Sequence, residues 1–572
     1  MDGRQCLPDL QRYRKGAVVS EGKSKVSVQT VGDKVQVAKN TMTIAVFNAL
    51  GMVGALGVDI LLAARFGLSS EMDALFVALT VPQLVYVIVS NSCSAVLVPS
   101  FSRLRVERRA DEVWKLFSAL VSIALLLFTA LAALGAAASP YIVVSTAPGL
   151  DGDSLALAIR LNRRLFWLLV PAGAVQTMGA VLNAHQRFAV PAALNLVRYG
   201  VVIAFAWAGA PSRGLGAVAA GYVAASVAQM VVLAFAVWRV GGRYRPALDL
   251  HDPELRNVGR LLGPSLLKGA VGQSGVVFER LLASFLPPGS ISAVGYARRI
   301  LRAVSSVLLS SVSTVLLPRF SVLAAGDRTP SLKRAVAFGV RLTSFLAVPV
   351  VILLVTLNVP IIHLAFQRGA FDAQATQITA GIMALYVLSV PPIAISQVIG
   401  DVLPAMGDTL TPLCIRIITL LTNVALDVAL VQVLGPYGLA LSLLLARGIG
   451  LGTEFVVVRR RLGAFGLGLK EHWVRLALAS APLAGVSLCA RWLWEHQQPL
   501  SWSYQLLTLI VASSLGLLAY GGVMLKMGVR GLDEAVAVLR RRWADRGTAR
   551  DGPSGTPSDE APNPEYGAEG MT

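Results

Sequence analysis

Long apolar stretches recur along almost the whole chain, and they constrain its fold more than any other feature. We count fourteen of them from residue 43 onward, each close to the ~20 residues that a helix needs to cross a bilayer. Inside a bilayer, backbone groups must be paired within the segment, so the runs predict transmembrane helices. The predicted spans are Thr43–Ala64, Leu75–Val98, Leu116–Ala138, Leu165–Leu182, Val190–Gly209, Leu215–Trp238, Leu261–Phe285, Ile291–Leu317, Ala335–Leu357, Ile378–Ile399, Leu413–Leu434, Gly438–Val458, Trp473–Trp494 and Tyr504–Leu525.

The composition agrees with an all-α membrane protein. Only 15% of the 572 residues are charged and the mean hydropathy is +0.65, whereas a soluble protein is about 25% charged. The net charge of +19 does not indicate nucleic acid, because the chain has too few polar faces to bind it. Lys and Arg that gather in cytoplasmic loops account for the same charge.

The distribution of basic residues predicts the topology. Loops after even-numbered spans carry clusters such as Arg103–Arg109 and Arg459–Arg461, whereas loops after odd-numbered spans carry few cations. This asymmetry places both termini in the cytoplasm of a cell whose inner membrane holds the protein. Residues 1–40 are polar and basic without an apolar core, which predicts a cytoplasmic tail rather than a cleaved signal peptide.

An internal repeat predicts how the helices are grouped. The segment Ser94–Leu104 recurs as Ser313–Leu323, with seven of eleven positions identical at an offset of 219. The copies close spans two and eight, so the two halves enter the membrane in the same sense. We therefore expect two six-helix lobes related by an axis along the membrane normal, with a central cavity between them. The predicted division is 1–40 basic tail, 41–250 N-lobe, 251–460 C-lobe, 461–543 last two helices with a basic end, and 544–572 disordered tail.

Several kinds of chemistry are not indicated. The four cysteines and five histidines are scattered, so neither a disulfide framework nor a metal site is readable. No GxxxxGK[ST] phosphate loop is present, and no nucleophile, base and orienting group converge. We therefore expect a non-enzymatic protein without a cofactor, which takes any energy it needs from an ion gradient or the membrane potential.

Charged residues inside the predicted spans are the candidate binding site, because charge at bilayer depth must face protein or a wet cavity. Spans seven and eight together carry several cations against a single carboxylate, which leaves positive charge that a pyrophosphate could neutralise. The alternative is that the charges pair internally or reach the headgroups, which we favour for Arg65 and Arg447. The candidate substrate-binding residues are Arg280, Arg298, Arg299, Arg302, Lys268, Glu279, Asp73 and Asp59.

A series of short motifs resembles the MurJ/MviN family, the lipid II flippases of the multidrug/oligosaccharidyl-lipid/polysaccharide exporter superfamily. The motifs occur in the family's order along the chain. They are Asp73–Ala78, Leu97–Ser100, Thr146–Gly149, Leu182–Pro191, Glu279–Leu286, Gly289–Ala293, Tyr296–Arg299, Phe366–Phe371, Gly407–Pro412 and Gly438–Leu441.

The resemblance implies a fourteen-helix transporter that works by alternating access. Its substrate would be undecaprenyl pyrophosphate carrying a sugar-peptide, with a groove for the lipid tail at the last two helices and with Asp73, Arg280 and Arg299 lining the cavity. One departure stands out. The family places arginines in its first two helices, but Thr43–Ala64 contains no Lys or Arg and the arginine pair of helix two is replaced by Tyr86-Val87.

That departure leaves other functions open. The alternatives are a flippase for another lipid-linked oligosaccharide of the exopolysaccharide or O-antigen type, an antiporter of organic cations, and a non-transporting scaffold for envelope-synthesis enzymes. A cation carrier needs a carboxylate-rich lumen, so we rank it lower. The polar run Ser90–Ser94 either lines the cavity or bonds to a neighbouring helix, and the sequence does not decide between the two.

Overall fold

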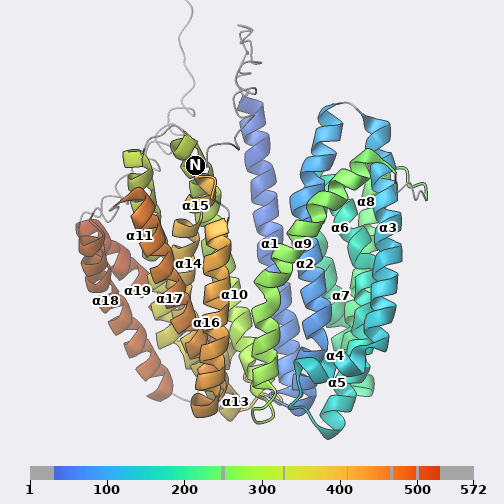
Figure 1. The fold of residues 1–572 in the computed structure, drawn as a ribbon. Helices are drawn as coiled ribbons and strands as arrows, with labels where there is room; N and C mark the ends of the chain where they lie inside the picture. Colours follow the sequence, from blue (N-terminus) through green and yellow to red (C-terminus); the bar gives the residue numbers. More distant parts are fainter. Residues whose placement is uncertain are drawn as a thin grey trace, which may run out of the picture.

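A computed structural model describes residues 31–107, 109–246, 251–325, 329–408, 410–463, 468–496 and 501–527, and these residues are almost entirely helical (Figure 1). The predicted tail 544–572 and residues 1–30 of the predicted basic tail lie outside these ranges. The first helix begins at Val31, within the predicted tail, while its part that is apolar enough to cross a membrane begins at Met42, next to the predicted Thr43. The stretch between Val31 and Thr43 contains no proline, so nothing in it forces the helix to stop short of its apolar part.

The chain forms two lobes followed by a pair of helices. The first lobe contains α1 (Val31–Phe66), α2 (Ser70–Val106), α3 (Ala110–Ala137), α4 (Ser139–Thr146), α5 (Gly152–Leu165), η1 (Phe166–Leu168), α6 (Leu169–Ala184), α7 (Ala189–Arg213) and α8 (Leu215–Arg239). The second contains α9 (Pro253–Ala283), α10 (Ser290–Ala325), α11 (Thr329–Thr356), α12 (Asn358–Phe366), α13 (Ala373–Leu388), α14 (Val390–Gly400), α15 (Val402–Ala405), α16 (Leu410–Leu434) and α17 (Pro436–Leu462). The final pair is α18 (Leu469–His496) and α19 (Trp502–Lys526).

The predicted spans coincide with these helices. Among the described residues, 12 helices are long and apolar enough to cross a membrane. The other two predicted spans are α9, with 31 residues, and α10, with 36 residues. At about 1.5 Å per residue both exceed the ~30 Å thickness of the hydrocarbon core. These two helices carry most of the charges that the sequence singles out.

The internal repeat extends well beyond the eleven-residue motif. Helices α3 and α11 begin 219 residues apart, at Ala110 and Thr329, and the short helices α4 and α12 keep the same offset. The hydropathy pattern did not predict α4 and α12, because each directly continues a long apolar helix. Both are short helices that end within the turn leading to the next span, so the two lobes share even their irregular elements.

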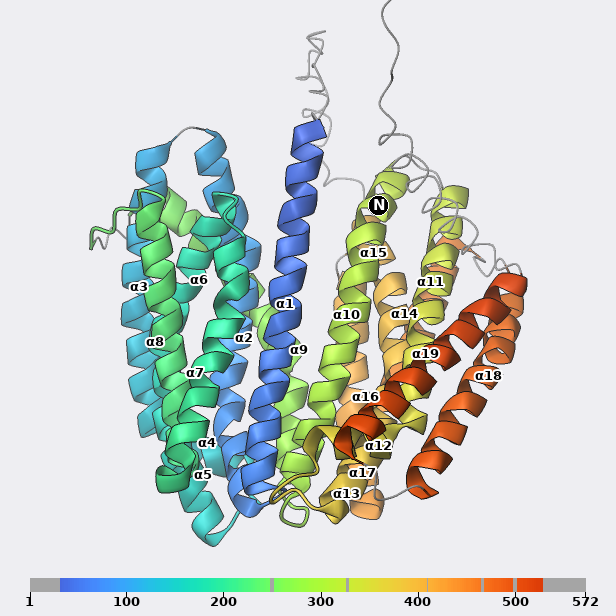
Figure 2. The ribbon, with the colours of Figure 1, turned by 180° about the vertical axis from the view of Figure 1, so that it is seen from behind.

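The two lobes meet at one end of the molecule, at the bottom of Figures 1 and 2. The backbone amide of Ala370, after α12, donates to the carbonyl of Ala64 in α1 at 2.8 Å. Gly369 next to it has φ +59, and a Cβ there would lie 2.2 Å from the Ala64 oxygen, so only glycine fits this contact. A second contact joins the turn after α4 to the end of α9, where the amide of Gly149 donates to Ser284 Oγ at 3.1 Å.

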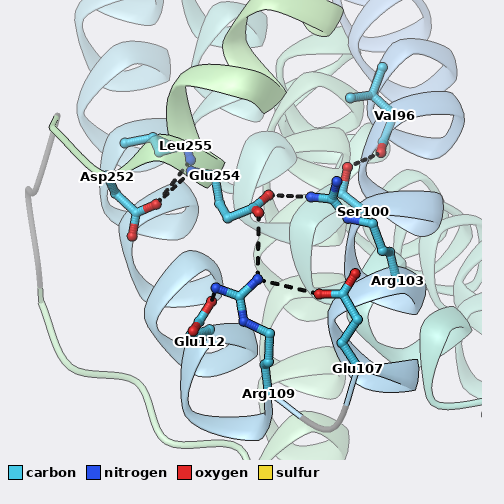
Figure 3. A network of polar contacts seen from close by, with 9 residues as sticks. All are labelled: Val96, Ser100, Arg103, Glu107, Arg109, Glu112, Asp252, Glu254 and Leu255. Atoms are coloured by element: carbon cyan, nitrogen blue, oxygen red, sulfur yellow. Dashed lines mark hydrogen bonds and ion pairs between the residues drawn. The ribbon is translucent and has the colours of Figure 1, made fainter. Parts of the chain in front are cut away.

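Helix α9 belongs to the second repeat but lies against both lobes, and it runs obliquely between them in Figure 1. Its Gly269 faces Ile88 of α2, and its Gly275 faces Leu420 of α16. Its first turn is capped by Asp252 and forms an ion pair between Glu254 and Arg103 of α2 (Figure 3). The start of this helix is therefore fixed to the N-lobe.

The last two helices attach to the C-lobe through α11. His472 of α18 forms a hydrogen bond with Ser344 at 2.8 Å, and the Tyr520 hydroxyl of α19 donates to the carbonyl of Phe345 at 3.0 Å. An apolar pocket of about 300 Å³ lies where α18 meets the C-lobe. Its lining residues are Val340, Ile395, Ile399, Gly448, Leu451, Gly452, Phe455, Leu469 and Trp473.

Candidate functional site

Asp73 caps a helix of the other lobe. Its carboxylate, at the start of α2, accepts the backbone amides of Gly289 at 2.6 Å and Ser292 at 2.7 Å, at the first turn of α10. A carboxylate is favoured there because the free amides and the helix dipole are both positive. Only 3% of Asp73 is exposed, so the expectation that it lines a wet cavity is corrected: it joins the two lobes.

Arg299 is also committed to a contact between lobes. Its guanidinium lies 2.6 Å from the carboxylate of Asp59 on α1, and its Cζ lies 5.5 Å from the ring centre of Phe76. Asp59 is 1% exposed. The expectation that one carboxylate serves the whole arginine cluster is therefore wrong, because the N-lobe supplies a second one across the interface.

Arg280 holds the turn between α9 and α10. Its side chain is buried, donates to the carbonyl of Ile291 at 2.8 Å and lies over the Phe76 ring at 5.0 Å. Through these contacts the guanidinium of Arg280 holds the start of α10 in place. Arg280 is thus not exposed to a ligand, contrary to the expectation that it lines the cavity.

Arg298 forms an ion pair with Glu279 of α9, and 19% of its side chain stays exposed. A polar cluster lies close enough to interact with it electrostatically. In that cluster Ser442 donates to Asp427, and the Asn423 amide donates to the same carboxylate at 3.1 Å. Arg298 is therefore partly neutralised but still accessible.

The accessible positive charge of the C-lobe comes from three helices. Arg302 of α10, Arg416 of α16 and Arg447 of α17 are all exposed, and none makes a hydrogen bond or ion pair with the part of the chain that the structure describes. Arg447 interacts electrostatically with Arg298, Arg416 and the buried Glu454. We call Arg298, Arg302, Arg416 and Arg447 the cationic surface.

Of the two arginines that we set apart from the site, one departs from its interpretation and the other agrees with it. We expected Arg447 to pair internally or to reach the headgroups, but it makes no hydrogen bond or ion pair within the described ranges and lies near the middle of α17, among other arginines. Arg65 does satisfy its charge locally, since it donates to the carbonyls of Ala206 and Trp207 at 3.0 and 2.9 Å. Lys268 is exposed on α9 and has no hydrogen bond or ion pair within the described ranges.

The N-lobe contains a pocket of about 450 Å³ with a different lining. Ser90 of α2 lines it and donates to Gln176 of α6 at 3.1 Å, so the polar run of helix two both faces a cavity and bonds to a neighbour. The polar lining residues are Asn48, Tyr86, Ser90, Ser94, Gln176, Asn183, Asn195 and Gln229.

Sequence reasoning missed one cation beside this pocket. The guanidinium carbon of Arg198, on α7, lies 5.0 Å from the ring centre of Tyr86 and 5.7 Å from that of Tyr222. Tyr86 stands where the resemblance places an arginine. The N-lobe thus has a cation next to that position, contributed by another helix; the presence of arginine inside span five was the signal available.

Two lobes of six spans with charge between them have the architecture of a polytopic membrane transporter, and comparisons with solved structures agree on this fold. A MATE family transporter of the MOP superfamily in an inward-facing conformation superposes with a TM-score of 0.63 at 14% identity, covering 74% of this chain and 98% of that one. The structure of "Lipid II flippase MurJ, inward closed conformation" gives a TM-score of 0.72 at 22% identity, covering 86% of this chain and 100% of the other.

The sequence identifies the family within that class. The profile of the Lipid II flippase MurJ family matches residues 62–513, so the chain belongs to this family. The lipid II flippase MurJ of Burkholderia cenocepacia is 26% identical over 518 residues, which cover 88% of this chain and 98% of the relative. A probable lipid II flippase MurJ of Rhizobium tropici is 29% identical over 462 residues, covering 76% and 84%. The resemblance seen in the motifs is confirmed, and the chain is a transporter rather than an enzyme.

Proposed function

We propose that this protein is a flippase that moves lipid II, an undecaprenyl pyrophosphate carrying a sugar-peptide, from the cytoplasmic to the periplasmic leaflet of the inner membrane. The cationic surface carries the proposal. Arg302, Arg416 and Arg447 present guanidinium groups at bilayer depth without a carboxylate bonded to them. Arginine forks suit the oxygens of a diphosphate, and an anionic ligand offsets the cost of the charge.

Alternating access is supported by where the lobes touch. The contacts of Ala64 with Ala370 and of Asp73 with the start of α10 lie at one end of the bundle. The arginine-rich turns after α2 and α17 lie at the opposite end, which the positive-inside rule assigns to the cytoplasm. In this arrangement the cationic surface is reached from the cytoplasm, where lipid II is made.

The lipid tail requires a separate, apolar path. The pocket between α18 and the C-lobe, with Leu451, Phe455 and Trp473 in its wall, offers such a path. Part of this wall belongs to α17, the helix that also carries Arg447 of the cationic surface. We assign the polyprenyl tail to this pocket, because hydrocarbon that leaves the bilayer must be covered by apolar side chains.

The membrane potential can drive this transport. Moving one charge through 100 mV changes its energy by about 2.3 kcal/mol. A cytoplasm that is negative inside favours outward movement of an anionic diphosphate, so export needs no ATP site. Envelope-synthesis enzymes on either side would supply and consume the lipid.

The test is complementation of cells depleted of their own lipid II flippase, with periplasmic exposure of lipid II as the readout. We expect the wild-type chain to rescue these cells. Arg302→Ala and Arg447→Ala should lower the rate of lipid II exposure at least about tenfold, because a charge-assisted contact is lost. The surface variant Arg213→Ala should behave as wild type. Unchanged rates in the first two variants contradict the site. Absence of rescue by the wild type contradicts lipid II as the substrate and favours either the scaffold or a flippase for another lipid-linked oligosaccharide.

A flippase for a different lipid-linked oligosaccharide is the second candidate, because the N-lobe departs from the family at Tyr86-Val87. Such a protein keeps the diphosphate contacts and changes the sugar contacts. Competition between lipid II and an O-antigen-type lipid for the purified protein separates the two: the true substrate displaces the other.

A further inference from the structure

The pocket inside the N-lobe has no role in the transport cycle described above. It lies among α1, α2, α6, α7 and α8, and its volume of about 450 Å³ falls within the range of about 300–1,000 Å³ typical of small-molecule sites. Its lining combines apolar side chains with amides and hydroxyls, and it contains no Lys, Arg, Asp or Glu.

Several of its polar groups have hydrogen-bonding capacity to spare. Ser90 and Gln176 bond to each other, and Gln229 donates to the carbonyl of Leu194 at 2.9 Å. The side chains of Asn48, Asn183 and Asn195, by contrast, make no hydrogen bond with residues in the described ranges. Each of these amides has one acceptor oxygen and two donor hydrogens.

The chemistry of this lining selects an uncharged, hydroxyl-rich ligand. A sugar hydroxyl both donates and accepts, which matches an amide, and the Tyr86 ring provides an apolar surface next to polar groups. A carboxylate or an amine would find no opposite charge in the lining and would lose its hydration without compensation. Neutral saccharide therefore fits better than the charged parts of a headgroup.

The pocket also adjoins the charges of the interface. Arg198 lies over Tyr86, a lining residue, and over Tyr222. Tyr222 in turn is close enough to interact electrostatically with Arg299 of α10. Arg198 and Tyr222 thus lie between the pocket wall and Arg299, on the helix that also carries Arg302.

We propose that the N-lobe pocket binds the uncharged saccharide of a lipid-linked substrate while the cationic surface binds its diphosphate. The proposal rests on the proposed function and deepens it, because the N-lobe binds the saccharide and the C-lobe binds the diphosphate of one headgroup. The departure at Tyr86-Val87 then has a functional explanation, because Tyr86 offers an aromatic ring to a sugar where the resemblance places an arginine.

Gly179 provides a way to fill the pocket without disturbing its wall. It lines the pocket on α6, and a Cβ built there meets no atom within 4 Å. Gly200 on α7 is equally open and does not line the pocket, so Gly200→Leu is the matched control. The full-length protein in nanodiscs is titrated with two probes, lipid II and undecaprenyl diphosphate, which carries no sugar.

We expect both Gly179→Leu and the near-isosteric Asn183→Leu to weaken lipid II binding by about tenfold or more. Gly179→Leu occupies the space that the sugar needs, and Asn183→Leu removes hydrogen bonds to the sugar. Binding of undecaprenyl diphosphate should stay within about twofold of wild type, and Gly200→Leu should change neither probe. Equal losses for both probes, or no loss for lipid II, overturn the saccharide site. Failure of the wild-type protein to bind either probe overturns the proposed function itself, so the two failures are distinct.

Discussion

The N-lobe and the C-lobe have the same succession of helices but different inner surfaces. The N-lobe presents Asn48, Gln176 and Asn195 to its pocket, whereas the C-lobe presents Arg302, Arg416 and Arg447. Side chains that face a cavity pack against little, so they can diverge without cost to the helices behind them. A duplicated scaffold can therefore divide one ligand between two chemically distinct halves.

Asp59→Ala should produce the largest effect, because Asp59 is the N-lobe carboxylate that pairs with Arg299 of the C-lobe. Removing one partner of a buried ion pair costs about 3–5 kcal/mol. Arg299 keeps 19% of its side chain exposed, so we expect a cost near the lower end of that range. The expected result is a marked fall in the thermal midpoint of the purified protein.

The matched control for that prediction is Glu495→Ala, which removes an exposed partner of Arg491 and should cost less than about 1 kcal/mol. The double variant Asp59→Leu/Arg299→Met should regain much of the stability, because it leaves no buried charge behind. A thermal midpoint unchanged by Asp59→Ala contradicts the interface described here.

The double variant Arg416→Ala/Arg447→Ala tests the charge difference between the lobes directly. Both side chains are exposed and unpaired within the described ranges, so their loss should leave the melting temperature within a few degrees. Affinity for undecaprenyl diphosphate should fall about tenfold or more, because two charge-assisted contacts disappear. Gln176→Leu in the N-lobe should leave this affinity unchanged. If Gln176→Leu lowers the affinity for undecaprenyl diphosphate as much as the double arginine variant does, the charge difference between the lobes does not decide where the diphosphate binds.

The two lobes also differ in how the helix before the final span of each repeat begins, and pH should reveal it. Asp408 accepts hydrogen bonds from the hydroxyl and amide of Thr411 at the start of α16, whereas α7 has no side-chain cap. The Thr411 bonds, aided by Arg461, hold the pKa of Asp408 below its usual value. Because the pKa of Asp408 is lower in the folded state, its carboxylate stabilises the helix start at pH above about 4. This stabilisation is lost as the pH falls through the folded-state pKa.

Hydrogen exchange measures this difference. Protection in the first turn of α16 should decrease below about pH 4 while that of α7 does not change with it, and Asp408→Asn should remove the pH dependence. The same acid response in both helices would falsify the assignment to Asp408.

Glu254→Gln should have the smallest effect. It weakens the ion pairs that fix the start of α9 to Arg103 and Arg109 of the N-lobe (Figure 3). These groups are partly exposed, so the cost should stay below about 1 kcal/mol and shrink with added salt. Exchange should rise at the first turns of α9 and not at α18 in the control Glu471→Gln. If Glu471→Gln also raises exchange at the start of α18, loss of any exposed glutamate near a helix start has this effect, and the ion pairs of Glu254 are not specific.

Much of the fold followed from local patterns. Apolar length located the 12 helices that are long and apolar enough to cross a membrane, together with the less apolar α9 and α10. The motif at Ser94 and Ser313 indicated the two lobes, because both kinds of signal lie in contiguous residues. The short helices α4 and α12 were missed for the same reason: their hydropathy does not differ from that of the spans they follow.

The site followed only in part. The sequence indicated that α9 and α10 concentrate charge, but it could not separate Arg280 and Arg299, which hold the interface, from Arg302, which is exposed. The roles depend on partners far away in the chain, such as Asp59 and Phe76. Arg198 and Glu454 were overlooked because a single charge within an apolar run has no meaning until its neighbours are known.

The sequence by itself determined that this chain crosses a membrane many times, that it is built from two repeats and that cations lie within it, because the bilayer acts on each segment separately. Only the tertiary structure decided which cations are neutralised, since an ion pair joins residues that chain order does not relate. It also decided that Asp73 is a cap and that the N-lobe holds a neutral pocket, because both arise where several helices meet.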